Sequence, residues 1–335
     1  MKIDSKRESN HFNFIRLFAA FLVFYGHMPT LVGNGAVSTV LNHELGVFIF
    51  FAISGYLISM SWDKDPSIKR FFIRRALRIF PALIIVTLVC VFILGPIMTT
   101  WELKEYFTSQ YIVLYLKNIF LYISYYLPGV FEHNPYPNAV NGSLWSLPVE
   151  FFMYIVVAVF GVIGNYKKYL ALGLFLFFVT VTILSVNTIP DTLVFYGVDF
   201  KQIPRTGVFF WAGATMFHWN IKKYFSFESF VIAILFLMFT YQWDYVYSVI
   251  SLFLIPFAVL SFGFSHSNIL SLFNKFDYSY GFYIYAFPVQ QSLVYLYPYM
   301  QMSYLLTMGF IITMVLAILS WHYVEKPMIQ LKPKR

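Results

Sequence analysis

Long apolar segments recur along the whole chain and alternate with short polar stretches. The hydrocarbon core of a bilayer is about 30 Å thick, so a helix needs about 20 mostly apolar residues to cross it. Segments of this kind lie near residues 12–30, 45–61, 79–99, 145–163, 169–186, 204–219, 225–241, 245–264, 278–296 and 302–321. The pattern predicts an all-α integral membrane protein with about ten spans, organised as one transmembrane domain over residues 1–335.

The composition and the cysteine count agree with this class of protein and exclude others. Of the 335 residues, 59% are hydrophobic and 11% are charged, with a mean hydropathy of +0.69, whereas soluble domains carry about 25% charged residues. The single cysteine, Cys90, lies inside a span, which excludes a disulfide framework and a metal site built on cysteine pairs. The charged leader MKIDSKRESNH runs directly into a full-length span without a small-residue cleavage site, so no cleavable signal is expected.

The positions of lysine and arginine predict the orientation in the membrane. With a cytoplasmic N-terminus, 18 of the 23 Lys and Arg residues fall on the cytoplasmic side, 4 fall outside, and Arg16 lies within a span. Membrane proteins carry an excess of these residues in their cytoplasmic loops, so both termini are expected in the cytoplasm. The same excess explains the net charge of +8 without a nucleic-acid partner.

The longest predicted external loop covers residues 100–144. Lys104 and Lys117 argue against a further span in its aromatic stretch at 106–127, so an interfacial or re-entrant helix is expected there. The sequence that follows, PGVFEHNPYPNAVNGS, is rich in Pro, Asn and Gly. It predicts irregular chain that would contact a polar substrate.

The first span contains two ionisable side chains, Arg16 and His27. Eleven residues of α-helix make about three turns, so the two lie within roughly 20° on one face and about 16 Å apart along the axis. Ionisable residues at membrane depth are costly and mark functional sites, and histidine suits general-base work on a hydroxyl group. The structural alternatives are an interfacial histidine bonded to a carbonyl group and an arginine that reaches the cytoplasmic headgroups.

Glu150 follows the external loop in the stretch NGSLWSLPVEFF. It is therefore expected near the outer surface, at about the depth of His27. A carboxylate there would orient an imidazole or bind substrate hydroxyl groups, and Trp145 would contact a sugar. The alternative is a solvated glutamate and an interfacial tryptophan at the start of a helix.

A cluster of arginines lies on the predicted cytoplasmic side, in IKRFFIRRALRIFPAL. Arg74 and Arg78 share a helix face at a spacing of four residues, and Arg75 is adjacent to Arg74. Arginine clusters near a helix N-terminus suit phosphate groups. The competing explanation is topology alone, with anionic lipid as the partner.

Three further polar residues lie inside predicted spans. Ser54, in FFAISGYLIS, would either let two helices pack closely or leave room for a slender ligand. Tyr283 and Gln290 would either bond neighbouring helices or line a site. The sequence contains no metalloprotease, nucleophile-elbow, P-loop or dinucleotide-binding motif, and no metal is expected.

Taken together, these segments resemble the membrane acyltransferase 3 family over essentially the whole chain. The matching motifs are Arg16 and His27 with ten residues between them, GVFIFFAISGYLIS at 46–59, Arg74-Arg75-x-x-Arg78, NGSLWSLPVEFFMY at 141–154, SYGFYIYAFPVQQ at 279–291, and VEKP at 324–327. Two positions depart from the family pattern. Phe48 replaces an acidic residue and Ala286 replaces a histidine found in many members, so no second catalytic histidine is expected in the ninth span. An extracytoplasmic hydrolase-like domain, which some members carry, is not expected here.

The resemblance implies acyl transfer, usually of acetyl, from cytoplasmic acyl-CoA to a hydroxyl group outside, in the inner membrane of a bacterium. The expected acceptor is a surface glycan such as O-antigen or exopolysaccharide, or its lipid-linked precursor, and membrane lipids are the other partners. The implied catalytic residues are His27 and Glu150. The implied donor-binding residues are Arg16, Ser54, Arg74, Arg75 and Arg78. The implied acceptor-binding residues are Trp145, Tyr283 and Gln290.

Two other functions use the same residues. A transporter or flippase for lipid-linked glycan or small solutes would also need buried ionisable groups. Against it, the two halves of the chain show no inverted pairing of broken helices. An enzyme that acylates a hydrophobic small molecule would differ in its acceptor alone.

Overall fold

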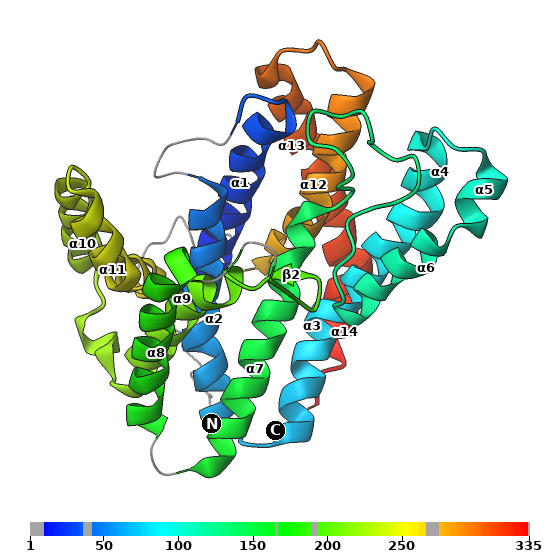
Figure 1. Ribbon diagram of the computed structural model, residues 1–335. Helices are drawn as coiled ribbons and strands as arrows, with labels where there is room; N and C mark the ends of the chain where they lie inside the picture. The colour runs from blue at the N-terminus through cyan, green and yellow to red at the C-terminus, as the bar shows by residue number, and fades with distance from the viewer. Residues whose placement is uncertain are drawn as a thin grey trace.

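The computed structural model describes residues 10–35, 42–164, 167–188, 190, 193–265 and 275–333. These residues form a helical bundle (Figure 1). The long helices are α1 (Phe12–Leu31), α2 (His43–Lys64), α3 (Ile68–Val89), α7 (Ser146–Ile163), α8 (Lys167–Thr188), α9 (Gln202–His218), α10 (Phe227–Thr240), α11 (Asp244–Phe264), α12 (Ser279–Leu296) and α13 (Met302–Ser320). A helix therefore lies at each of the ten predicted positions, which confirms the helical class.

Short elements connect or extend the long helices. They are η1 (Cys90–Leu94), α4 (Gly95–Met98), α5 (Leu103–Thr108), α6 (Gln110–Leu116), η2 (Lys117–Phe120), η3 (Gly142–Trp145), η4 (Ile221–Tyr224), η6 (Trp321–Glu325) and α14 (Lys326–Gln330). Two-residue strands β1 (Val194–Phe195) and β2 (Val198–Asp199) pair antiparallel. The π-helical turns η1 and η6 each end two residues before a proline, Pro96 and Pro327. Proline removes a helical hydrogen bond and crowds the preceding turn, so the helix is locally widened there.

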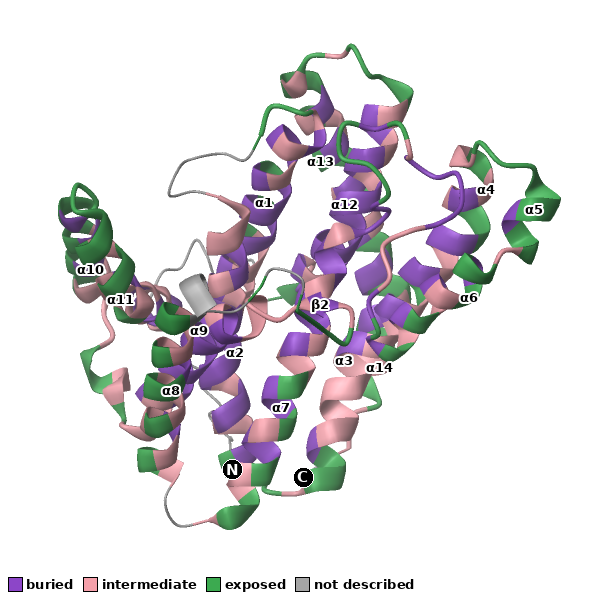
Figure 2. Ribbon diagram, viewed as in Figure 1, coloured by how far each residue is buried: buried purple, intermediate pink, exposed green. Residues whose placement is uncertain are grey.

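Seven helical segments in the described part of the chain are long and apolar enough to cross a membrane. They are Phe12–Leu31, His43–Lys64, Ile68–Met98, Gly142–Ile163, Lys167–Leu184, Asp244–Phe264 and Met302–Gln330. The other three predicted spans coincide with α9 and α10, which have 17 and 14 residues, and with α12. Most residues of α9 and α12 are buried by neighbouring helices (Figure 2). Helices buried in this way need less apolar surface than helices that face lipid.

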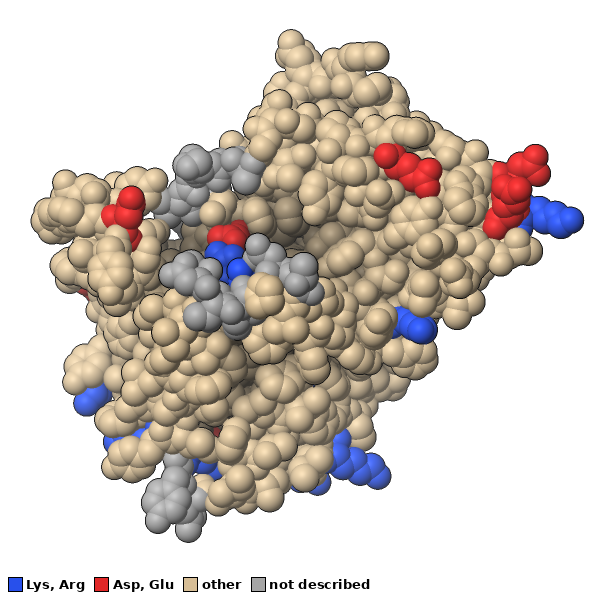
Figure 3. Space-filling model, in the orientation of Figure 1, with Lys and Arg blue, Asp and Glu red and all other residues tan. Residues whose placement is uncertain are grey.

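Few charged side chains are visible on the face shown in Figure 3, and one group of acidic and basic side chains lies left of its centre. Most of the Lys and Arg side chains visible there lie along its lower edge, where α2 and α7 end and α3 begins (Figures 1 and 3). A surface on which charged side chains are sparse is what a bilayer requires, because charges at membrane depth are costly. The basic edge is the one that the orientation rule assigns to the cytoplasm, and that orientation stays a prediction.

The centre of the bundle depends on the close approach of α2 and α9. A Cβ atom added to Gly55 of α2 would overlap the carbonyl oxygen of Phe210 on α9. A Cβ atom added to Gly213 of α9 would overlap the carbonyl oxygen of Ala52 in the same way. Small residues at such contacts let two helix backbones touch. In the Ser54-Gly55 pair, the glycine therefore permits the close helix packing. The Ser54 side chain faces the interior of the bundle.

Substitution of Gly55 by alanine should destabilise the bundle, because both atoms that would collide belong to backbones and cannot rotate away. Overpacking of this kind costs typically about 1–3 kcal/mol. The measurement is the unfolding temperature of the purified protein in detergent. Gly173→Ala on α8 is the matched control, since nothing lies within 4 Å of the added Cβ and alanine favours a helix by up to about 1 kcal/mol over glycine. Equal unfolding temperatures for the two variants would contradict the close contact.

The loop predicted to be external, residues 100–144, contains helix as expected, but the helix is broken into α5, α6 and η2. Ser109 is extended between α5 and α6, and its side chain caps α6. The irregular chain beyond η2 is held against α12 by amide side chains. Asn134 Nδ2 donates to Gln291 Oε1 at 2.8 Å, and Gln291 Nε2 donates to the carbonyl oxygen of Ala139 at 2.8 Å. Asn141 Nδ2 donates to the carbonyl oxygen of Ile284 at 2.9 Å. These hydrogen bonds hold the end of the loop inside the bundle, between the long helices. Helix α7 therefore starts inside the bundle and not at its end.

Candidate active site

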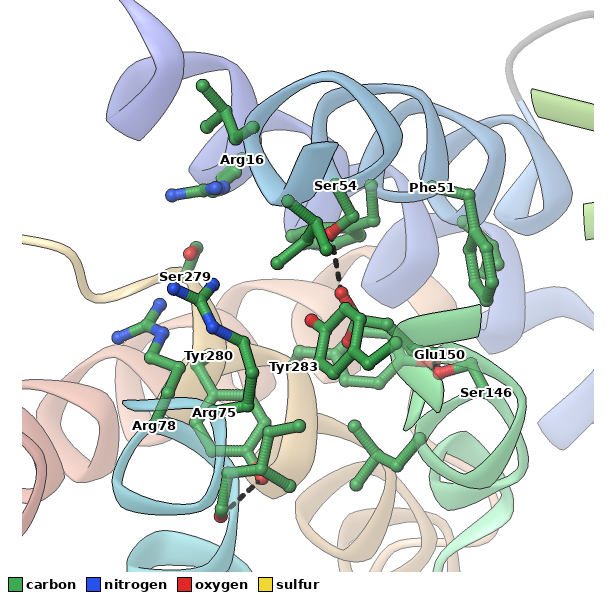
Figure 4. Close-up of a pocket in the computed structure, with 17 residues that line it drawn as sticks. Arg16, Phe51, Ser54, Arg75, Arg78, Ser146, Glu150, Ser279, Tyr280 and Tyr283 are labelled. Carbon is green, nitrogen blue, oxygen red and sulfur yellow. Dashed lines mark hydrogen bonds between the residues drawn. The ribbon is translucent and has the colours of Figure 1, made fainter. Parts of the chain in front are cut away.

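A cavity of about 110 Å³ lies where α1, α2, α3, α7 and α12 meet. It faces the first two turns of α1 and α12, the first half of α7 and the middle of α2. Its polar and aromatic lining consists of Arg16, Ser54, Arg75, Arg78, Ser146, Glu150, Tyr154, Ser279, Tyr280 and Tyr283, besides apolar residues. Figure 4 shows the three arginine side chains at one end of the cavity, and Ser54, Glu150, Ser146 and Tyr283 at the other. The structure thus brings together six residues predicted from sequence.

Two of the three arginines are paired with buried carboxylates. Arg78 Nη2 donates to Asp277 Oδ2 at 2.7 Å, and its Nη1 donates to Glu325 Oε2 at 3.4 Å. Arg16 Nη1 lies 3.6 Å from Asp277 Oδ2. Burial by itself would raise the pKa of Asp277, but Arg78 and Arg16 hold it below its ordinary value. Arg16 and Arg78 therefore enter the cavity with much of their charge already balanced.

Arg75 differs from Arg16, Arg74 and Arg78 because it has no carboxylate within ion-pair distance in the described structure. Its Nη2 lies 3.5 Å from Ser61 Oγ, and its Nε is buried without a hydrogen-bond partner in the described structure. Lys332, just beyond α14, adds a further cation nearby: burial and then the charges of Arg75 and Arg78 lower its pKa to about 8. The N-terminal turns of α1 and α12 also face this end of the cavity, and their dipoles favour negative charge. This end of the cavity is therefore suited to an anion.

Arg74 does not belong to the cavity lining, contrary to its expected grouping with Arg75 and Arg78. Its Nη1 donates to Asp65 Oδ2 at 2.6 Å, and Arg70 Nη2 donates to Asp65 Oδ1 at 2.6 Å. Hydrogen bonds from Arg70 and Arg74 hold the pKa of Asp65 below its usual range. Successive helical residues are rotated by about 100°, so when Arg75 faces the cavity Arg74 faces the chain that follows α2.

The other end of the cavity contains a carboxylate bonded to hydroxyl groups. Ser54 Oγ donates to Glu150 Oε1 at 2.5 Å. Tyr283 Oη donates to the carbonyl oxygen of Ser143 at 2.8 Å and lies 2.8 Å from Ser146 Oγ. Ser54 and Tyr283 line a site as predicted, and their hydrogen bonds also connect α2, α7 and α12.

The expected depth of Glu150 is wrong. Its partner Ser54 lies eleven residues after His43, the first residue of α2, which is about 16 Å along the helix. The external loop descends into the bundle before α7 begins, and this carries Glu150 to the level of Arg16. The structure therefore does not bring Glu150 to His27.

His27 lies towards the C-terminal end of α1, the end predicted to be external, and does not line the cavity. Its ring centroid is 5.0 Å from that of His43, with an interplanar angle of 33°. The Phe287 ring lies 5.2 Å away in an edge-to-face arrangement. His27 Nδ1 is buried and has no hydrogen-bond partner among the described residues. The imidazole is thus half-buried, in contact with rings and open to a further polar partner.

His43 is the neighbouring residue that sequence reasoning missed. One signal for it exists in the sequence. Two antiparallel helices joined by a short connection bring together residues at equal distances from that connection. His27 and His43 stand eight residues either side of residue 35, which lies in the connection between α1 and α2.

The remaining two predicted residues lie outside the cavity lining. Gln290 is buried, and its Nε2 donates to the carbonyl oxygen of Phe24 at 2.7 Å, which ties α12 to α1. Trp145 ends η3 and packs half-buried against the main hydrophobic core. Their expected contact with an acceptor stays a prediction. No group of three or more metal-ligating side chains occurs in the described part of the chain.

Comparison with known proteins places the whole bundle in one family. The family model described as an acyltransferase domain, that of acyltransferase family 3, matches residues 10–322. An O-acetyl transferase of Shigella phage Sf6 is 32% identical over 95% of this chain and 96% of its own length. Nodulation protein 10 of Rhizobium leguminosarum bv. viciae is 32% identical, over 46% of this chain and 44% of its own length.

A third relative is larger. The peptidoglycan O-acetyltransferase OatA of Listeria monocytogenes serovar 1/2a is 31% identical over 46% of this chain and 27% of its own length. No solved structure gives a significant match. The motifs, the helical bundle with its membrane-length helices and the matched family agree. This chain therefore belongs to acyltransferase family 3 and is a multi-pass membrane acyltransferase.

Proposed function

We propose that this enzyme transfers an acetyl group from acetyl-CoA, bound from the cytoplasm, to a hydroxyl group of a glycan outside the bacterial inner membrane. One observation carries the proposal. Helix α1 has Arg16 in the cation-rich cavity and His27 towards its outer end. The two are about 16 Å apart along the axis. A donor anchored by its phosphates at one end would reach the imidazole with an extended pantetheine arm of comparable length.

Arg75 is the main donor-binding residue in this proposal. Its guanidinium has no carboxylate within ion-pair distance in the described structure, so a phosphate would not have to displace an existing partner. Arg78 and Lys332 would add charge, and Arg16 would border the arm. Ser54, Glu150 and Tyr283 supply hydroxyl and carboxylate groups for the polar amides of the arm. Charge-assisted hydrogen bonds from guanidinium to phosphate are among the strong ones in proteins.

His27 is the proposed general base. The acceptor hydroxyl gives its proton to the imidazole as its oxygen attacks the thioester carbonyl carbon. The carbon–sulfur bond then breaks, and the proton passes from the imidazolium to the departing thiolate. The products are the O-acetyl ester and free coenzyme A. General acid–base catalysis of this kind contributes about 10²–10⁴-fold to a rate.

A glycan acceptor is supported by two observations. The names of two relatives include O-acetyl transfer, one of them to peptidoglycan. The irregular part of the external loop reaches the His27 region, because Tyr136 contacts the same Phe287 ring at a centroid distance of 6.2 Å. Polar loop residues beside an imidazole are suited to a carbohydrate.

The test is the O-acetyl content of surface glycan, measured by NMR in a bacterial host with and without this gene. We expect acetyl signals that depend on the gene, and thermal stabilisation of the purified protein by acetyl-CoA. Stabilisation by coenzyme A without any gene-dependent glycan ester would point to a hydrophobic small-molecule acceptor. Absence of stabilisation, together with uptake of a labelled solute into proteoliposomes, would instead support transport.

A further inference from the structure

The outer end of α1 and the start of α2 contain a pair of histidines. The His27 and His43 ring centroids are 5.0 Å apart, and the rings are inclined by 33°. Asn42 caps α2 through its Oδ1, which accepts from the backbone nitrogen of Leu45 at 3.0 Å. The first residue of a capped helix has a defined backbone direction. The backbone of His43 is therefore held in place by the start of α2, and the backbone of His27 is held in place by α1.

The backbones of α1 and α2 touch at this point, so the contact between the rings does not depend on long side chains. A Cβ atom added to Gly26 would overlap the backbone nitrogen of His43. About two turns earlier along α1, a Cβ atom added to Gly46 of α2 would overlap the carbonyl oxygen of Ala19. The two glycines therefore allow the close approach of α1 and α2 at both contacts. The histidine next to Gly26 consequently faces the histidine that begins α2.

The charged groups around this pair are few. Glu44, next to His43, accepts an ion pair from Arg205 of α9 at 2.9 Å, which occupies its carboxylate. On α12 the side chain that meets His27 is Phe287, which has no charge. Glu150 is bonded to Ser54 about 16 Å further along α2. Among the described residues, His43 is thus the titratable side chain in contact with His27.

We propose that His43 is the proton partner of His27 in acyl transfer, an inference that rests on the function proposed above. A general-base histidine needs a neighbour that orients the ring and shares the proton it accepts. In this protein a second imidazole takes the place of the usual carboxylate. The proton removed from the acceptor hydroxyl is shared within the pair and returns to the thiolate of coenzyme A when the carbon–sulfur bond breaks. Two nearby imidazolium ions repel each other, so the pair holds one proton at a time.

The test is the steady-state rate of acetyl transfer by His43→Gln, measured from pH 5.5 to 9 with the purified protein in nanodiscs. We expect kcat to fall about tenfold to a hundredfold, which is no more than the lower limit of what a general acid or base contributes, because His43 acts through His27. The KM for acetyl-CoA and the unfolding temperature should stay unchanged, and the pH dependence of kcat should change shape. His218→Gln, at the end of α9 away from the pair, is the matched control and should behave as the wild type.

A second variant separates proton transfer from a packing effect. His43→Ala leaves space beside His27, and added imidazole should restore part of its activity in proportion to the unprotonated imidazole present. Loss of activity in His43→Ala without rescue by imidazole would overturn the proposal, as would a wild-type pH profile in His43→Gln. If the wild type transfers no acetyl group from acetyl-CoA, the proposed function fails together with the pair. If the wild type transfers acetyl and His43→Gln does so equally well, the pair alone fails.

Discussion

Replacement of His27 by alanine should abolish acetyl transfer while leaving acetyl-CoA binding intact. The imidazole lies about 16 Å along α1 from the cationic cavity, and it does not line that cavity. Its loss should therefore remove proton transfer without removing any phosphate contact. We expect a fall in kcat of about 10²–10⁴-fold. The measurement pairs the initial rate with labelled acetyl-CoA and the dissociation constant of the donor from calorimetry.

The control for this prediction is His218→Ala, which removes a half-buried histidine from the end of α9. It should retain the full rate. His27→Gln serves as a second variant, because glutamine keeps hydrogen-bonding groups at the site and cannot act as the base. A His27→Ala enzyme that transfers acetyl at the wild-type rate would rule out a catalytic role for this residue.

Arg75→Ala should weaken acetyl-CoA binding without lowering the stability of the protein. Its guanidinium has no carboxylate partner within ion-pair distance in the described structure, so its removal leaves no buried charge unpaired. Hydrogen bonds to charged groups contribute about 1.5–3 kcal/mol, which corresponds to a loss of donor affinity of about tenfold to a hundredfold. Calorimetry measures the donor affinity, and the unfolding temperature in detergent measures stability.

The neighbouring arginines provide matched comparisons for this result. Arg78→Ala should also lower the unfolding temperature, since it would leave Asp277 and Glu325 without their shared cation. Breaking a buried pair in this way costs about 3–5 kcal/mol. Arg74→Ala should leave donor affinity unchanged, because Arg74 is bound to Asp65 away from the cavity. Equal losses of affinity for Arg74→Ala and Arg75→Ala would contradict the assignment of Arg75 as the donor contact.

The positions of the helices could be predicted from the sequence alone, and so could the family to which the protein belongs. Bilayer thickness demands apolar segments of a certain length, so all ten predicted positions contain a helix. The apolar criterion is satisfied by seven of the described segments. Helix α12 does not meet this criterion. Most of its residues are buried by neighbouring helices, so they need not be as apolar as residues that face lipid. The motifs around Arg16, His27 and Glu150 indicated the family, because they are short and local, and the match over residues 10–322 confirms it.

The partners of the site residues were decided by the tertiary structure. The rotation of α3 about its axis determines that Arg75 and Arg78 face the cavity while Arg74 faces Asp65. The descent of the external loop determines that Glu150 meets Ser54 at the level of Arg16. The contact of two backbones at Gly26 determines that His43 faces His27. Helix rotation, loop depth and helix separation depend on packing between segments far apart in the chain, and a pattern of residue types along one segment does not contain that information.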